Sequence, residues 1–527
     1  MDFGFPVRSL LIILTSFPFA FSYGVPPSPC ASLPQAAHHL GFSKHIQYDS
    51  SSLEVGTLNL TGVTGTNNYS LCRVIGTIAY GTKYNNTLNF ELWLPDSSNY
   101  NGRYLSIGNG GFAGTIDYET MMTNLNGGYA VGGHVPIGCD SGHPVTSNDP
   151  SMPGGYVEFL NNRDETLVWI QDSIAMFTGP AKELTTTYYS KAPKKMYYFG
   201  CSTGGAQGFA LAQLHPDIFD GIYAGSPGNY YSHLILSFLW NGLNSNSTES
   251  FLSQDALNFI TNAVVKKCDT IDGVQDGIID DPRKCDFDIS ALACSGHQKS
   301  IVNNATVCLT APQIANARKF YSGPKNPKTG ESIYPGFVLG SETEWLQQET
   351  SLYLQYGVPI LQNFVFKNLN YDYTKFNWGS DVDAVDRTAT PLISEISPDL
   401  HAFKKHGGKM IVTQGWADPY NAPGWPIQQR NEMHGIFGNE LADFYSLFMV
   451  PGGGHCGGAS NYPQMPGTYN LLSERLVPWV ENGAIPEDIM ASNPADGSNS
   501  TRKLCPYPQE AKYEKGDIND WMSYICI

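Results

Sequence analysis

Positive charge is scarce in this chain, and charged residues of either sign are few. They make up 15% of the sequence, and 48 Asp and Glu outnumber 31 Lys and Arg, which leaves a net charge of −17. A nucleic-acid-binding protein needs a cluster of positive charge, so we set that class aside. With 41% hydrophobic residues, the chain is neither disordered nor a coiled coil.

Long apolar runs are also missing, apart from one at the N-terminus. Arg8 precedes that run, Pro18 interrupts it, and Ala20 and Ser22 have the spacing of a signal-peptidase site. The uninterrupted part is too short for a membrane anchor. We therefore predict a signal peptide over residues 1–22, a secreted protein and no membrane span.

Cysteines and glycosylation sequons fit this location. All 11 cysteines follow the predicted signal peptide, so most should be paired in an oxidising compartment. N-x-[ST] sequons, the acceptor sites of N-glycosylation, stand at Asn59, Asn68, Asn85, Asn246, Asn304 and Asn499. We predict a secreted glycoprotein.

Strand and helix patterns alternate in two blocks, which predicts an α/β fold. Strand-like runs fill residues 71–135, a helical pattern covers 164–189, and "KMYYFG" is a short strand before a helix and another strand. The alternation resumes in "HGGKMIVTQGWADP" and "DFYSLFMVPGGGH". Residues 229–390 differ in composition, so we predict an insertion there, with the catalytic domain over 23–228 and 391–527.

The segment from Gly200 to Gly204, "GCSTG", fits the G-x-S-x-G pattern of a serine nucleophile. It lies between a predicted strand and a predicted helix, where the turn is tight and the helix N-terminus favours negative charge. A chain with 54 glycines can match the pattern by chance. The strand and helix around it nevertheless favour Ser202 as the nucleophile.

A nucleophilic serine needs a base, and the base needs a carboxylate to orient it. In α/β-hydrolases these follow in the order Ser, acid, His. Asp418 and His455 each follow a predicted strand, at the sheet edge where such sites gather. Asp217 and Asp220 are alternative acids, although they follow the helix after the nucleophile. The other histidines considered, His134, His143 and His215, fit ordinary loop or cap positions.

Two of these candidates have a cysteine as direct neighbour. Cys201 precedes Ser202, and Cys456 follows His455. If Ser202 and His455 lie within hydrogen-bond reach, the two cysteines come within reach of a disulfide. We predict that bond, which would tie nucleophile to base across the whole insertion.

With these motifs the sequence resembles the tannase and feruloyl esterase family of secreted serine esterases. The mark of that family is a Cys-Ser, Asp, His-Cys arrangement, matched here by Cys201-Ser202, Asp418 and His455-Cys456. The resemblance covers nearly all of the mature chain. It implies an α/β-hydrolase fold in which residues 229–390 form a lid domain, and acyl transfer through an acyl-enzyme.

The oxyanion of such a reaction needs two hydrogen-bond donors. In α/β-hydrolases one is the amide of the residue after the nucleophile, here Thr203, and the other lies in a Gly-rich loop after an earlier strand. The segment "IGNGGFAG" is the candidate loop, with Gly110 or Gly111 as the donor. A plain turn is the alternative interpretation of this segment.

An acidic segment, "CDTIDGVQDGIIDDPRKC" over residues 268–285, offers hard oxygen ligands for Ca²⁺. It lacks the spacing of an EF-hand, and a solvated acidic loop is the alternative. The family resemblance implies a structural calcium in the lid and no organic cofactor. Carried over, its ligands are the carboxylates of Asp269, Asp272 and Asp276 and the carbonyls of Val274 and Ile278.

Local spacing suggests partners for the remaining cysteines. The expected pairs are Cys268 with Cys285, Cys294 with Cys308, Cys505 with Cys526, and Cys30 with Cys72. Cys139 is then left over, so either it is a buried free thiol or the Cys30 pairing is wrong.

The resemblance implies phenolic esters as substrates, either hydroxycinnamates of the plant cell wall (ferulate, p-coumarate, caffeate) or gallates. We prefer hydroxycinnamates, because fungal tannases of the family are often cut at a Lys-Arg site in the lid, and none occurs here. Aromatics over residues 353–378 are the expected lining of a ring slot. An inactive binding protein and a general lipase are the alternatives, and the oligomeric state is left open.

Overall fold

The computed structural model describes the chain except for residues 1–29, 36–44, 61, 64, 84, 128–133, 144–151, 296–299, 303–304, 458–464, 467–470 and 494–499. The predicted signal peptide, Asn304 and Asn499 lie outside the described residues. The sequon residues Asn59, Asn68, Asn85 and Asn246 are exposed, and their glycosylation stays a prediction. Within the described ranges, no helix has the length and apolar character needed to cross a membrane.

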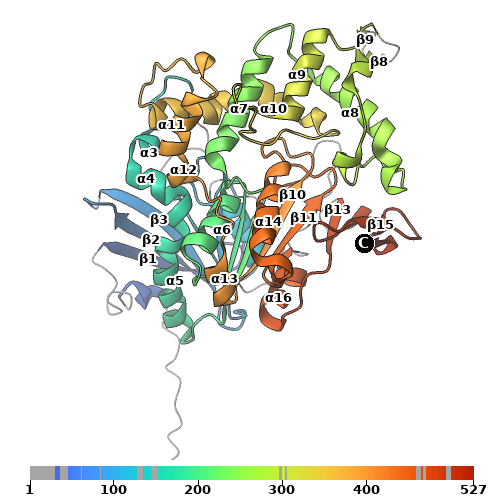
Figure 1. Cartoon of the computed structure of the whole chain (residues 1–527). Helices are drawn as coiled ribbons and strands as arrows, with labels where there is room; N and C mark the ends of the chain where they lie inside the picture. Colours follow the sequence, from blue (N-terminus) through green and yellow to red (C-terminus); the bar gives the residue numbers. More distant parts are fainter. Residues whose placement is uncertain are drawn as a thin grey trace, which may run out of the picture.

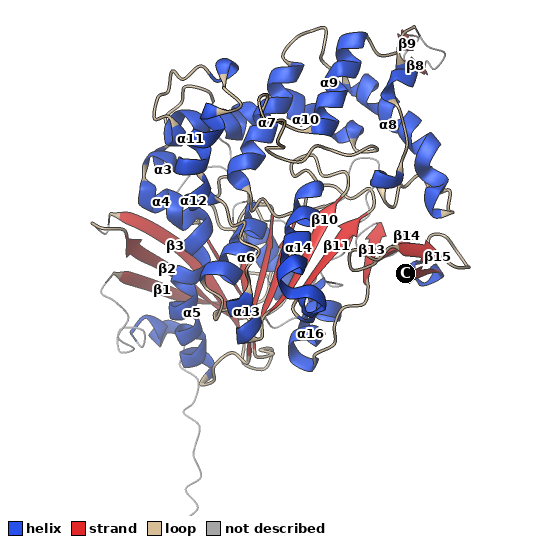
Figure 2. Cartoon of the chain, viewed as in Figure 1, coloured by secondary structure: helices blue, strands red, loops and turns tan. Residues whose placement is uncertain are grey.

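A mixed sheet of nine strands forms the base of the molecule (Figures 1 and 2). In spatial order the strands are β1 (Ile46–Leu53), β2 (Leu71–Tyr80), β3 (Asn86–Pro95), β5 (Val135–Cys139), β4 (Arg103–Ile107), β6 (Lys195–Cys201), β7 (Gly221–Gly225), β10 (Lys409–Gly415) and β11 (Tyr445–Val450). β1, β2, β3 and β5 pair antiparallel, and the strands from β5 to β11 pair parallel. The predicted α/β-hydrolase type of fold is confirmed.

Helices cover both faces of the sheet. One face carries α5 (Ser173–Tyr189), α6 (Thr203–Leu214), α13 (His401–His406) and α14 (Gly424–Phe437), and the other carries α2 (Tyr118–Leu125), η11 (Leu472–Leu476) and α16 (Val477–Asn482). Successive side chains of a strand point to opposite faces, so in β6 Tyr198 packs in the first core and Tyr197 in the second. Before α5, the chain forms α3 (Glu158–Asn161), α4 (Arg163–Leu167) and the π-helical turn η2 (Val168–Asp172).

The segment between β7 and β10 forms a second layer above the sheet (Figure 1). Its main elements are α7 (Tyr231–Ser245), α8 (Gln254–Cys268), α9 (Ala311–Ser322), α10 (Leu346–Thr350), η7 (Tyr353–Gly357), η8 (Ile360–Val365), α11 (Ser380–Thr388) and α12 (Thr390–Ile393), with the small hairpin β8 (Ser300–Val302) and β9 (Ala305–Val307). A separate core built around Leu257, Phe320 and Trp345 supports this layer. The boundaries 229–390 of the lid stay a prediction.

The C-terminal segment lies beside the far edge of the sheet. It contains β12 (Met465–Pro466), β13 (Ile489–Asn493), β14 (Ser500–Leu504), β15 (Ala511–Tyr513) and β16 (Tyr524–Cys526), in one three-stranded and one two-stranded sheet. From β14 the buried side chain of Arg502 reaches the acidic segment of the lid, where it contacts Asp272, Asp276 and Asp280. The C-terminal segment is thereby attached to the lid as well as to the sheet.

Candidate active site

The nucleophile candidate occupies a strained turn between β6 and α6. Ser202 has φ of +63°, a conformation that residues with a side chain rarely adopt, and its N–H donates to the carbonyl of Gly225 at 2.9 Å. A Cβ atom on Gly200 would lie 2.5 Å from the Gly204 carbonyl oxygen, and one on Gly205 would lie 2.7 Å from that of Gly225. Gly200 and Gly205 are therefore required for the turn that exposes the Ser202 hydroxyl.

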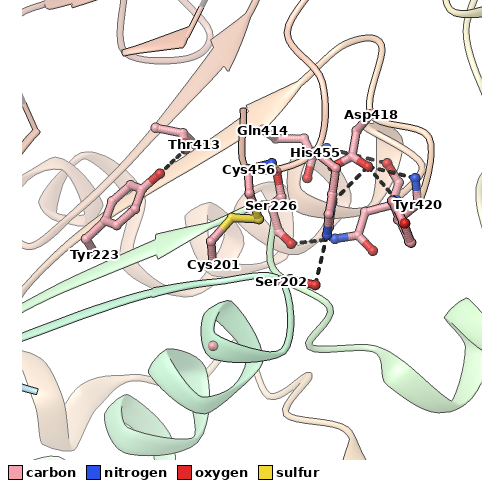
Figure 3. The surroundings of a disulfide bond; sticks show 12 residues. Cys201, Ser202, Tyr223, Ser226, Thr413, Gln414, Asp418, Tyr420, His455 and Cys456 are labelled. Carbon is pink, nitrogen blue, oxygen red and sulfur yellow. Dashed lines mark hydrogen bonds and ion pairs between the residues drawn. A yellow bond between two sulfur atoms is a disulfide. The ribbon is translucent and has the colours of Figure 1, made fainter. Parts of the chain in front are cut away.

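Ser202, His455 and Asp418 lie in one hydrogen-bonded row (Figure 3). The Ser202 Oγ is 2.8 Å from His455 Nε2, and His455 Nδ1 is 3.0 Å from both carboxylate oxygens of Asp418. Asp418 follows β10, and His455 follows β11, so both side chains come from the carboxyl ends of parallel strands. This is the geometry that a serine nucleophile, a base and an orienting acid require.

The alternative acids and histidines are engaged elsewhere. Asp220 binds the Lys195 ammonium group at 2.7 Å and the Met196 N–H at 2.9 Å, and Asp217 is not in the row. The three other histidines are each hydrogen-bonded away from Ser202: His134 to Asn101, His143 to the Phe112 carbonyl, and His215 to Asp172.

The Asp418 carboxylate is fully buried but well provided with donors. It accepts hydrogen bonds from the backbone N–H groups of Tyr420 (2.8 Å) and Asn421 (3.0 Å) and from Gln414 Nε2 (2.9 Å). Burial acts to raise its pKa, but the neighbouring His455 and the backbone amides outweigh burial, so the pKa of Asp418 lies below its ordinary value. At neutral pH Asp418 is a carboxylate that fixes His455 with Nδ1 as the donor.

A disulfide joins the two cysteines beside this row. Cys201 and Cys456 are bonded with an S–S distance of 2.04 Å and a Cα–Cα distance of 5.9 Å (Figure 3). The structure also forms the other four expected pairs, Cys30–Cys72, Cys268–Cys285, Cys294–Cys308 and Cys505–Cys526. Cys139 is a free, buried thiol, and burial raises its pKa well above the ordinary value.

The glycine-rich loop after β4 is held against the first turn of α6. The Thr203 hydroxyl donates to the Gly111 carbonyl at 2.8 Å, and Gln207 accepts from the Asn109 N–H at 3.0 Å and donates to the Asn109 side chain at 3.1 Å. Gly110 and Gly111 both line the cavity at Ser202. The choice between their amides as the second oxyanion donor therefore stays open.

A cavity of about 250 Å³ opens beside Ser202. One face of α7 supplies Tyr231, Leu234 and Phe238 to its wall, and Tyr356 and Tyr420 complete the aromatic lining. Of the described residues that line it, none is Asp, Glu, Lys or Arg. The cavity is thus suited to an uncharged aromatic group next to the nucleophile.

The predicted ring slot is correct only in part. Tyr356 lies within the expected range 353–378, but Trp378 packs edge-on against Trp240 instead of lining the cavity. The contribution of α7 was missed, although "YSHLILSF" places Tyr231, Leu234 and Phe238 three and four positions apart, the spacing of one helix face.

The acidic segment of the lid surrounds a cation of the protein itself. The Arg502 guanidinium donates to Asp272 at 2.7 Å, to Asp280 at 3.3 Å and to Asp276, while Asp269 accepts the N–H groups of Asp276 (3.1 Å) and Gly277 (2.8 Å). Among the described residues, no three Asp, Glu, His or Cys side chains converge as metal ligands do. Nothing in the sequence around Arg502 indicates this role.

This segment nevertheless holds more negative charge than one guanidinium neutralises. Burial raises the pKa of Asp276, and it raises the pKa of Asp280 to about 6 in spite of Arg502. An additional cation would stabilise the charged form of such buried carboxylates, and their hard oxygens are the ligands that Ca²⁺ prefers. The donor set fits calcium by its chemistry, whereas its arrangement around Arg502 does not show such a site.

Comparison with known protein families finds one match over most of the chain. The family model described as tannase and feruloyl esterase matches residues 72–527. Feruloyl esterase B of Aspergillus niger is 32% identical over 482 residues, which are 87% of this chain and 87% of that protein. An uncharacterized esterase of Xanthomonas campestris is 32% identical over 507 residues, 87% of this chain and 84% of its own.

Solved structures show the same relationship. The crystal structure of feruloyl esterase B from Aspergillus oryzae matches with a TM-score of 0.82 and 26% identity, covering 95% of this chain and all of that one. A tannin acyl hydrolase from Aspergillus niger shares the fold, with a TM-score of 0.77, 20% identity and coverage of 95% and 96%.

Proposed function

Because the chain belongs to the tannase and feruloyl esterase family and is a carboxylic ester hydrolase acting on phenolic esters, we propose that it is a secreted serine esterase. Its proposed products are hydroxycinnamic acids, namely ferulic, p-coumaric and caffeic acid, which it releases from plant cell-wall esters. One observation carries the proposal: the row of Ser202, His455 and Asp418 opens into an uncharged aromatic cavity. The row fits acyl transfer, and the cavity fits the ring of the acid.

In the proposed reaction, the Ser202 Oγ attacks the ester carbonyl carbon while His455 Nε2 takes the hydroxyl proton. Asp418 orients His455 and stabilises its cationic form. The oxyanion of the tetrahedral intermediate accepts hydrogen bonds from the Thr203 amide and from that of Gly110 or Gly111. His455 then returns the proton to the leaving alcohol, and a water molecule activated by the same imidazole hydrolyses the acyl-enzyme.

Two observations favour hydroxycinnamoyl over galloyl esters. A trihydroxylated ring brings three polar groups into the site, and burying a hydroxyl without a partner costs about 1–3 kcal/mol. Leu234 and Phe238 offer such hydroxyls no partner, so outside the catalytic row only the polar side-chain groups of Tyr231, Tyr356, Tyr420 and Asn421 are left to pair with them. The 32% identity to feruloyl esterase B also supports the proposal, whereas the tannin acyl hydrolase supports only the fold.

The test is the release of free acid from methyl ferulate, caffeate, p-coumarate, sinapate and gallate, with tributyrin as a lipase substrate. We expect release of hydroxycinnamates, and we expect the Ser202→Ala variant to lose about 10⁴-fold or more in kcat. Release of gallate alone would make the enzyme a tannase, and tributyrin cleavage alone a lipase. An equally active Ser202→Ala variant would exclude the serine esterase mechanism.

We also propose that the lid, residues 229–390, binds a structural calcium ion through Asp269, Asp272, Asp276 and the carbonyls of Val274 and Ile278. The excess of buried negative charge described above supports this proposal. Chelation by EDTA should lower Tm by several degrees and leave the initial kcat almost unchanged. An unchanged Tm, together with no bound metal by elemental analysis, would leave Arg502 as the cation of this segment.

Secretion is the remaining part of the proposal. The five disulfides fit an oxidising compartment such as the extracellular space. N-terminal sequencing of the protein recovered from culture medium tests cleavage after Ser22, and a protein retained inside the cell with residues 1–22 intact would contradict it.

A further inference from the structure

The loop that carries Asp418, residues 416–423, is held from above by the lid. Gln348 of α10 is fully buried, and its side-chain N–H donates to the Pro419 carbonyl at 2.7 Å. Its Oε1 accepts a hydrogen bond from Asn241 of α7 at 2.9 Å. Because a carbonyl only accepts, the Gln348 amide must present its nitrogen to Pro419. Two lid helices therefore orient this one amide group.

The Pro419 carbonyl belongs to the same planar peptide unit as the Tyr420 N–H, which donates to Asp418 Oδ1 at 2.8 Å. Gln348 holds one end of this unit, and Asp418 accepts from the other. If the Gln348 donor is lost, the peptide unit is free to rotate. The carboxylate then loses one of the donors that set its orientation toward His455.

Tyr420 adds a second contact between lid and row. Its hydroxyl donates to Gln347, the neighbour of Gln348, at 2.9 Å, and its ring lies 4.4 Å from the His455 imidazole. Adjacent glutamines of α10 thus contact the backbone and the side chain of the same short loop. That loop carries Asp418, and through the Tyr420 ring it also packs on His455.

We infer that Gln348 is a positioning residue through which the lid orients the acid of the triad. The inference rests on the proposed roles of Ser202, His455 and Asp418. It assigns the lid a part in the acid and base chemistry itself, in addition to its part in the substrate cavity. Gln348 does not line that cavity, whereas Tyr420 and Asn421 of the loop do, so its loss should lower turnover more than it weakens substrate binding.

The experiment compares two buried lid glutamines. Gln348→Met keeps the size of the side chain and removes the donor. Gln362→Met is the matched control, because Gln362 also donates to a carbonyl (Tyr371, 3.1 Å) and accepts an N–H (Gly154, 2.7 Å), and both of these partners lie outside the acid loop, residues 416–423. Ser202 reactivity is measured with phenylmethylsulfonyl fluoride, and kcat and KM with methyl ferulate.

We expect Gln348→Met to lower both kcat and the rate of sulfonylation about tenfold, with KM within twofold of wild type. Gln362→Met should keep both rates, although we expect each of the two substitutions to lower Tm. Unchanged rates in Gln348→Met, or equal losses in both variants, would overturn the inference.

A second variant covers the possibility that Gln348→Met does not fold. In Gln348→Glu the carboxyl group can still accept from Asn241, and it can donate to Pro419 only when protonated. Its loss of sulfonylation rate should therefore grow as the pH rises, and a loss that is constant with pH would overturn the inference. Sulfonylation needs no phenolic ester, so a wrong substrate assignment would silence methyl ferulate and leave this readout intact.

Discussion

The nucleophile and the acid of the triad are held in different ways. Ser202 is fixed by its own backbone, by the glycines around it and by a hydrogen bond to the neighbouring strand at Gly225. Asp418 accepts the backbone N–H groups of Tyr420 and Asn421, but it also depends on side chains from two places, Gln414 on the preceding strand and, through the Pro419 peptide, Gln348 in the lid. The nucleophile is thus a local feature of the sheet, whereas the geometry of the acid is a tertiary feature that needs the lid.

Replacing the carboxylate itself should give the largest effect. In Asp418→Asn the side-chain oxygen can still accept the N–H groups of Tyr420 and Asn421, but the charge facing His455 is lost. We expect kcat to fall about 10⁴-fold with a small change in Tm. Steady-state kinetics measure kcat, and thermal unfolding measures Tm. A large loss of Tm would mean that the substitution disrupts the loop, so that the loss of kcat would not report the missing charge alone.

The Cys201–Cys456 bond connects the nucleophile to the base, which Asp418 orients, and is the next test. Its sequence separation is 255, against 21 for Cys505–Cys526, and chain entropy gives upper figures of about 5 and about 3 kcal/mol. The Cys201→Ser/Cys456→Ser variant should lose stability and at least tenfold in kcat, because these cysteines adjoin Ser202 and His455. The Cys505→Ser/Cys526→Ser variant should lose stability and keep its kcat per folded molecule.

Activity and unfolding are measured on both double variants and on wild type after mild reduction. Full turnover without the Cys201–Cys456 bond would show that Ser202 and His455 keep their positions without a covalent link. The hydrogen bonds around Asp418 would then be the remaining difference between the nucleophile and the acid.

The smallest effect concerns Glu349, next to Gln348 in α10. Burial raises its pKa to about 7, and hydrogen bonds from the Leu252 N–H and from Asn316 offset only part of this. An unfolded glutamate has a pKa of about 4.3, so the folded state binds the proton more tightly. The stabilisation is present at acidic pH and is lost as the pH rises toward about 7.

Glu349→Gln should therefore raise Tm by a few degrees at pH 8 and by less at pH 5. Thermal unfolding at the two pH values measures this, with Glu249→Gln, an exposed lid glutamate, as the control. Equal changes at both pH values would show that the charge of Glu349 does not weaken α10, the helix that holds the loop of Asp418.

Much of the site could be predicted because its signals are local. The "GCSTG" turn reports a backbone that only small residues permit, and the cysteines beside Ser202 and His455 report a distance between two remote segments. The order of strands and helices was enough for an α/β fold, and the family resemblance supplied the α/β-hydrolase type. Of the strand-like runs expected over residues 71–135, the last reaches the start of β5 (Val135–Cys139), and residues 128–133 lie outside the described part of the chain.

The contacts that support the site left no such signal. Gln348 is one of several glutamines in "WLQQETSLYLQYG", and nothing near it indicates that it reaches Pro419, 71 positions away. Arg502 lies 230 positions from Asp272, in a strand with no chemistry of its own. Pairings of this kind depend on how the lid and the C-terminal segment pack on the sheet, which a single sequence does not specify.

The disulfide between Cys201 and Cys456 has a consequence for proteolysis. It encloses the entire lid, so a protease that cuts the backbone once between these cysteines yields two polypeptides that remain one molecule. One polypeptide would carry Ser202 and the other His455, and the two would separate only after reduction. The lid can therefore be nicked in a protease-rich medium without the halves of the triad drifting apart.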